Sequence, residues 1–179
     1  MSIPAGTYTL GPEHGVLSVR TGRTGAAAKA GHDLLIHVTA WQATLEVGEK
    51  TSLVLDADST SLRVREGTGG MQALGDDDRA SIQETIDDEI LKRQAIAFRS
   101  TAVETADGDR MSVRGELTLA GATAPIAFDL GVDDQGALSG SAVVKQTDWG
   151  ITPYSALFGA LKVADEVEVA VDARLPQSL

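Results

Sequence analysis

Residues 113–132 read VRGELTLAGATAPIAFDLGV, and apolar side chains recur at every second position through most of this stretch. They lie on both sides of Gly121-Ala122-Thr123, at Val113, Leu117 and Leu119 before it and at Ile126, Phe128, Leu130 and Val132 after it. A period of two gives a strand one apolar and one polar face, as half-buried antiparallel strands require. The segment therefore predicts a β-hairpin that turns near Gly121.

The same alternation recurs along the chain. Further strands are expected near Tyr8 and Leu17 and over residues 41–47, 51–57, 96–103, 138–145 and 167–173, with turn residues such as Gly48-Glu49 and Asp133-Asp134-Gln135-Gly136 between them. The result is eight or nine strands, a number typical of an up-and-down barrel or a sandwich. We interpret the chain as one all-β domain over residues 1–179.

A change of parity favours the barrel. Apolar residues fall at even positions from Leu34 to Val38 and at odd positions from Trp41 to Val47. Such a pattern stays on one face only if an extra residue is inserted, so a β-bulge is predicted near Ala40. Bulges bend the long strands of barrels, so an eight-stranded antiparallel barrel is preferred to a flat sandwich.

Two helices interrupt the strands in this prediction. Residues 78–92 follow three aspartates and carry Ile82, Ile86 and Ile90 four apart, which predicts a helix with one apolar stripe across a barrel end or flank. Thr152-Pro153 resembles a helix start, and apolar residues follow with helical spacing, so a short helix is predicted near 153–161.

Composition excludes several classes of function. The net charge of −11 disfavours nucleic acid and anionic membranes, and the absence of cysteine removes disulfides and thiolate chemistry. The sequence has no apolar run long enough to span a bilayer and no signal-peptide pattern at its start, so a cytoplasmic protein is expected. A homodimer is left open.

Candidate catalytic and metal residues are sparse. His32 and His37 lie five apart in a strand-like segment, a spacing that disfavours zinc, so no metal is expected. No Gly-x-Ser-x-Gly elbow or triad pattern occurs. The enzymatic alternative, chemistry on a bound lipid or polyketide, would depend on His32, Asp33 or Asp148 as acid or base.

The apolar strand faces leave two readings, a filled core or a ligand cavity. An eight-stranded barrel is near the size at which its interior either fills with side chains or holds one ligand. With only 7 aromatic residues and much Ala and Val, the chain fills such a space with difficulty, which favours a cavity. A filled-core interaction protein is the remaining alternative.

Several motifs resemble the YceI-like family over nearly the whole chain. They are Pro12-Glu13-His14-Gly15, Ile96-Ala97-Phe98-Arg99-Ser100-Thr101-Ala102-Val103, the Gly115-Glu116-Leu117-Thr118 to Thr123-Ala124-Pro125 hairpin, Asp148-Trp149-Gly150-Ile151 and Asp165-Glu166-Val167. The segments 30–36 and 145–155 look like a cytoplasmic actinobacterial branch. The resemblance implies an extended, lipocalin-like antiparallel barrel with a helical excursion. It also implies an elongated apolar pore that holds a long isoprenoid chain, such as a quinone tail or a polyprenyl phosphate.

We therefore expect non-catalytic binding, carriage or sensing of a long apolar lipid, with no cofactor beyond a bound isoprenoid lipid or quinone. The proposed rim residues are His32, Gln146, Tyr154 and Ser155. The proposed apolar lining is Trp41, Leu55, Phe98, Leu117, Phe128, Val144, Trp149 and Phe158.

Overall fold

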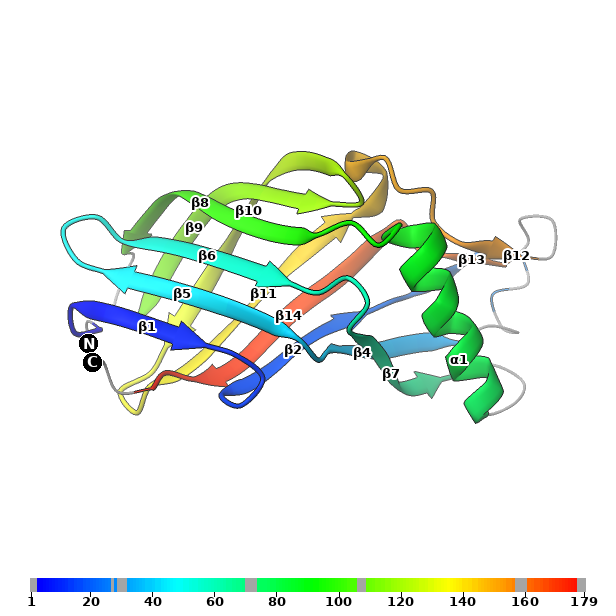
Figure 1. The fold of residues 1–179 in the computed structure, drawn as a ribbon, viewed down its shortest axis with the longest axis horizontal. Coiled ribbons are helices and arrows are strands. Elements are labelled where there is room, and N and C mark those ends of the chain that lie inside the picture. The colour runs from blue at the N-terminus through cyan, green and yellow to red at the C-terminus, as the bar shows by residue number, and fades with distance from the viewer. Residues whose placement is uncertain are drawn as a thin grey trace.

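Eleven strands form one curled antiparallel sheet in the computed structural model, which describes residues 3–26, 28, 32–69, 74–105, 109–156 and 161–176 (Figure 1). The order across the sheet is β1-β5-β6-β8-β9-β10-β11-β14-β2-β4-β7. The strands are β1 (Gly6–Leu10), β2 (Gly15–Arg20), β4 (Asp33–Val38), β5 (Trp41–Val47), β6 (Ser52–Ala57), β7 (Leu62–Thr68), β8 (Ile96–Thr105), β9 (Arg110–Leu119), β10 (Ala122–Val132), β11 (Ala137–Lys145) and β14 (Glu166–Arg174).

The predicted hairpin at Gly121 is confirmed as β9 and β10. Leu119 pairs with Ala122, and the ladder continues to Arg110 opposite Gly131. Ala120 and Gly121 close the turn with φ of 50° and 83°, a left-handed conformation that costs glycine little. The hairpin is long enough to form one wall of the curled sheet.

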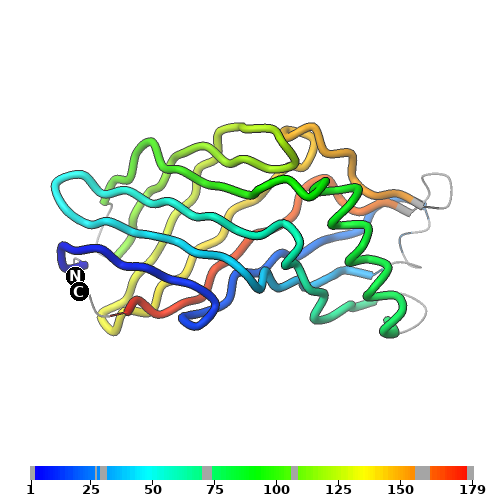
Figure 2. The backbone as a smooth tube through the Cα atoms, in the orientation of Figure 1, coloured from blue at the N-terminus to red at the C-terminus, as the bar shows by residue number. Residues whose placement is uncertain are grey.

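The sheet curls because β4 and β5 follow each other in the chain but pair with different neighbours. β5 pairs with β1 and β6, whereas β4 pairs with β2 and β7. Only Thr39 and Ala40 separate the two strands, and the backbone bends there (Figure 2). Segments near opposite ends of the strand order are thus held together by the chain itself.

The parity change predicted near Ala40 is confirmed, but not as a bulge. Ile36 and Val38 before the break and Trp41 and Leu45 after it are all buried on the same inner side. The two residues between β4 and β5, Thr39 and Ala40, change the parity of the inward-facing positions. The register irregularities lie elsewhere, between Leu35 and Ile36 and between Ser100 and Ala102.

The predicted count of eight strands is not confirmed. The structure is all-β with one α-helix and a half-barrel of eleven strands, because breaks such as Thr39–Ala40 divide long runs into separate strands. A second sheet of three short strands contains β12 (Ser155–Ala156), β13 (Leu161–Val163) and β3 (Arg23–Thr24). These segments were not predicted as strands.

The helix predicted at 78–92 is confirmed with shifted bounds. It consists of α1 (Asp76–Thr85) followed by a π-helical turn, η2 (Ile86–Ile90). Ile82, Ile86 and Ile90 are partly buried against the main apolar cluster, so the predicted stripe does face the sheet. Figure 1 places α1 across one end of the sheet, the end toward which β12 and β13 also lie.

The short helix predicted near 153–161 is wrong. Ser155 pairs with Lys162 and Ala156 with Leu161, so both described ends of this segment are strands. Residues 157–160, including Leu157 and Phe158, lie outside the described residues. A helix this short is marginal on its own, and Gly159 weakens it further. Pairing between β12 and β13, and between β13 and the distant β3, prevails instead. The described helical turn lies earlier, at η3 (Gln146–Trp149).

Candidate functional site

The concave side of the sheet and the inner face of the helix enclose a partly open cavity of about 820 Å³. Its lining comes mainly from alternate residues of the strands and is dominated by Leu, Ile, Val and Phe. Cavities of this size with apolar walls are typical of sites for small apolar molecules. The apolar strand faces therefore surround a hollow instead of filling it.

Nine of the twelve residues proposed from the sequence border this cavity: His32, Trp41, Leu55, Phe98, Leu117, Phe128, Val144, Gln146 and Tyr154. Two of them form an aromatic pair, since the ring centroids of Phe98 and Phe128 lie 5.3 Å apart with the ring planes tilted by 57°. Tilted aromatic pairs add stability beyond burial, so this pair gives the wall a fixed shape.

Three proposed residues do not belong to this group. Trp149 is buried but packs with Val144 and Ile151 in a separate small cluster, where its indole Nε1 donates to the Leu117 carbonyl at 2.7 Å. Ser155 is exposed on β12 and does not border the cavity. Phe158 lies outside the described residues.

The sequence analysis did not assign helix residues to the cavity wall. Ile82, Ile86 and Ile90 border it from α1 and η2. The signal was present, because their spacing of four predicts one apolar face, but the sequence does not show which surface that face covers. Leu45 and Leu130 also border the cavity, and they were expected on the apolar strand faces but were not among the proposed ligand contacts.

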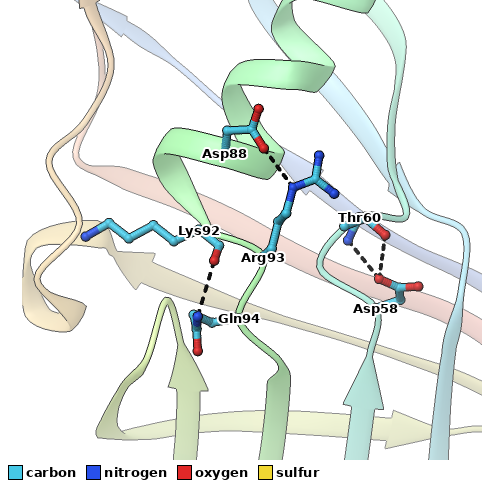
Figure 3. A network of polar contacts seen from close by, with 6 residues as sticks. All are labelled: Asp58, Thr60, Asp88, Lys92, Arg93 and Gln94. Atoms are coloured by element: carbon cyan, nitrogen blue, oxygen red, sulfur yellow. Dashed lines mark hydrogen bonds and ion pairs between the residues drawn. The ribbon is translucent and has the colours of Figure 1, made fainter.

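The helix is anchored at both ends. At its start, the Asp78 carboxylate accepts a hydrogen bond from the Gly75 backbone N–H at 3.0 Å, and Leu74 packs where a side chain at Gly67 would collide with it. At its end, Arg93 Nε lies 2.8 Å from Asp88 Oδ1, and Gln94 Nε2 donates to the Lys92 carbonyl (Figure 3).

The turn between β6 and β7 is drawn in the same view of Figure 3. Asp58 Oδ1 accepts from both the backbone N–H and the hydroxyl of Thr60, at 2.9 and 2.8 Å. These bonds favour the charged carboxylate and lower the pKa of Asp58. The turn that lets the chain reverse beside the helix is thereby fixed.

Polar and charged side chains border the cavity at the end near α1, β12 and β13, which we call the helical end. Arg23 of β3 pairs with Asp33 of β4, with Nε 3.0 Å from Oδ1. Lys162 and Asp78 also border the cavity there. This end thus has both charge signs, while the wall beyond it is apolar.

The acid and base candidates of the enzymatic alternative have different surroundings. His32 borders the cavity, Asp33 is engaged by Arg23, and Asp148 is exposed on η3 outside the cavity lining. Within the described ranges, no three His, Asp or Glu side chains cluster in a way suited to a metal ion. The described part of the chain likewise contains no helix able to cross a membrane.

Comparison with known proteins identifies the family. The YceI-like domain model matches residues 8–175. The chain belongs to the YceI-like family. No curated protein matches the sequence.

Solved YceI-like structures share the fold at low sequence identity. BcnA of Burkholderia cenocepacia is 16% identical, with a TM-score of 0.62 over 87% of this chain and 94% of that one. The YCEI protein of Campylobacter jejuni is 12% identical, with a TM-score of 0.58 over 80% of this chain and 85% of that one. A mutant of the latter has been solved with a monobromobimane guest, at a TM-score of 0.60, 12% identity and the same two coverages of 80% and 85%.

Proposed function

We propose that this YceI-like protein binds a long apolar lipid of the isoprenoid type in its cavity and acts as a carrier or sensor, without catalysis. The observation that carries the proposal is the cavity of about 820 Å³ with an apolar wall running from Ile82 at the helix to Leu130 in the sheet. Each methylene group removed from water contributes about 0.8 kcal/mol, so a few isoprene units offset the cost of ordering the chain.

The aromatic and aliphatic side chains of the wall give affinity for the tail. Phe98 and Phe128 present ring faces and edges, and Trp41, Leu55 and Leu117 extend the same surface. Family membership supports this assignment, since it is a family of binding proteins for apolar ligands. Asp33 is paired with Arg23, and Asp148 is exposed and does not border the cavity, which favours binding over the enzymatic alternative.

The test uses two neighbouring residues of β11. Ala142 borders the cavity, whereas Val143 is 59% exposed on the other face of the same strand. Ala142→Phe places a ring inside the cavity and should weaken binding of the fluorescent apolar dye N-phenyl-1-naphthylamine by about tenfold or more, because the ring occupies volume that several ligand carbons would fill.

Val143→Phe is the matched control and should bind the dye like the parent protein. Urea unfolding of both variants shows whether each retains its fold. Solvent extraction of the purified parent protein should also release an isoprenoid lipid. Equal dye binding by the two variants, or no dye binding by the parent protein, would contradict the proposal.

A further inference from the structure

One polar side chain is buried in the cavity wall. Gln146, the first residue of η3, is only 7% exposed and borders the cavity beside Val144 and Ile151. Apart from the indole of Trp41, the other side chains with polar groups that border the cavity within the described ranges, such as Lys162 and Tyr154, are exposed or half-buried. A buried amide in an apolar wall is costly unless its hydrogen-bonding groups are satisfied.

The orientation of this amide is fixed by its neighbours. Gln146 Nε2 donates to the Ala164 carbonyl at 3.1 Å, and a carbonyl can only accept, so the nitrogen must face Ala164. The backbone N–H of Gln146 donates to the Asp165 carbonyl at 2.9 Å, and its own carbonyl accepts from Ile151 at 3.1 Å. Hydrogen bonds therefore fix both the backbone of Gln146 and its side-chain amide nitrogen.

The amide oxygen is left as a free acceptor. Gln146 Oε1 makes no hydrogen bond to any described residue, although the side chain is more than nine-tenths buried and borders the cavity. An oxygen in this position can accept one or two hydrogen bonds from a ligand. A bare hydrocarbon would leave it unsatisfied, and a ligand with an O–H group would not.

Charges at the helical end do not favour a strongly anionic ligand. Among the described residues, the cations Arg23 and Lys162 are matched by the carboxylates Asp33, which pairs with Arg23, and Asp78. The chain as a whole has a net charge of −11. A phosphate or diphosphate would bring further negative charge to a balanced site on an acidic protein.

We propose that the cavity selects a lipid whose head group is an uncharged hydroxyl, alcohol or phenol, and that this hydroxyl donates its hydrogen bond to Gln146 Oε1. The inference rests on the proposed lipid-binding function. A hydroxyl is the smallest head group that can donate to Gln146 and also accept through its own oxygen. Tyr154 and Lys162 border the same end, and Val163 N–H donates to the Tyr154 carbonyl at 2.9 Å, which joins the residue before β12 to β13.

The experiment compares ligands that share one tail and differ only in the head group. The probes are geranylgeraniol, a hydroquinone with the same prenyl tail, geranylgeranyl methyl ether and geranylgeranyl monophosphate, each competed against N-phenyl-1-naphthylamine. The parent protein should bind one or both hydroxyl lipids about tenfold more tightly than the ether, the size expected of a hydrogen bond to a buried acceptor. Whichever hydroxyl lipid shows the gain identifies the source as an alcohol or a phenol.

Gln146→Met replaces the amide with an apolar chain of similar length and should abolish the difference between alcohol and ether. The matched control is Gln42→Met, which makes the same change at an exposed position of β5 and should preserve the difference. The head-group series on the parent protein keeps the inference testable even if Gln146→Met folds poorly after losing its bond to Ala164.

The outcomes separate this inference from the proposed function. Equal affinity for alcohol, phenol and ether, or tighter binding of the monophosphate, would overturn the hydroxyl assignment while leaving lipid binding intact. A preference for the hydroxyl lipids that persists in Gln146→Met would show that Gln146 is not the acceptor of the ligand hydroxyl. Failure of all four probes to displace the dye would count against the proposed function itself.

Discussion

Both tryptophans were proposed from the sequence as apolar lining of the cavity, but the structure separates them. Trp41, at the start of β5, packs in the larger cluster and borders the cavity, and its buried indole Nε1 has no hydrogen-bond partner among the described residues. Trp149 does not border the cavity, although Val144 and Ile151, with which it packs, do, and its Nε1 is bonded to the Leu117 carbonyl. Both rings are buried, so burial does not distinguish the tryptophan of the cavity wall, Trp41, from the structural one, Trp149, which we call the plug. The hydrogen bonding of the indole Nε1 does distinguish them.

Replacing Trp149 should have the largest effect on stability. Trp149→Ala removes a large buried side chain together with the hydrogen bond to Leu117, and we expect the free energy of unfolding to fall by about 3–5 kcal/mol. Urea denaturation measures this change. Dye affinity of the protein that remains folded should stay within about twofold of the parent, because the ring does not border the cavity.

Trp41→Ala is the comparison for that variant. It should cost less stability, since the ring already faces a hollow and its N–H has no bond to lose, but it should change dye affinity more than Trp149→Ala does. If the two alanine variants shift stability and binding by the same amounts, the distinction between wall and plug fails.

Phenylalanine at the same two positions sharpens the comparison by testing the indole N–H group. Trp149→Phe leaves the Leu117 carbonyl without this donor and should lower the free energy of unfolding by about 1–3 kcal/mol. Trp41→Phe removes an unsatisfied buried donor, which offsets the loss of packing, so its change should stay within about 1 kcal/mol of zero.

Thermal unfolding of the two phenylalanine variants in the same buffer shows which substitution lowers the stability more. Both substitutions remove the same atoms, so the difference between them reports the hydrogen-bond environments. A larger loss for Trp41→Phe than for Trp149→Phe would contradict the assignment of Trp149 as the bonded plug.

The sequence was sufficient where a pattern is local and repeated. Alternation from Val113 to Val132 predicted the β9–β10 hairpin, and the parity change around Ala40 predicted that both halves of the segment face one interior. The isoleucine stripe from Ile82 to Ile90 predicted the helix and its packing face. The strand features follow from apolar residues that recur every two residues, and the helix follows from apolar residues that recur about every four.

The sequence was insufficient where one local structure competes with another. Tyr154 is joined to Val163 and Ser155 to Lys162, and Lys162 also pairs with the distant Thr24, whereas the Thr152-Pro153 pattern predicted a helix. Likewise, the sequence could not show that the Trp149 ring points to Leu117, or that Gln146 is buried in the wall instead of at the rim. Direction of a side chain at the end of a strand depends on the turn that follows, here η3.

The smallest expected effect is a pH dependence of η3, the turn that contains Gln146 and Trp149. The hydroxyl and then the backbone N–H of Thr147 donate to Asp165 at 2.7 and 2.9 Å, and these bonds lower the pKa of the Asp165 carboxyl. A lowered pKa means that the carboxylate stabilises the fold above the unfolded pKa near 3.9 and that this contribution is lost as the pH falls through the folded value. Acid should therefore loosen η3.

Asp165→Asn tests this link, because the amide still offers an oxygen to Thr147 but does not titrate near pH 4. Asp133→Asn is the matched control, since backbone bonds from Ala137 and Gln135 also lower the pKa of Asp133 at a turn away from the cavity end. Both variants should weaken the pH dependence of the unfolding midpoint between about pH 3 and 5. In the parent protein, the preference for the alcohol over the ether should decrease in acid, because Asp165 adjoins Ala164, the hydrogen-bond partner of Gln146. Asp165→Asn should keep this preference constant with pH, whereas Asp133→Asn should behave like the parent protein. Identical behaviour of the two variants in the binding assay would mean that η3 does not transmit the titration of Asp165 to the cavity wall.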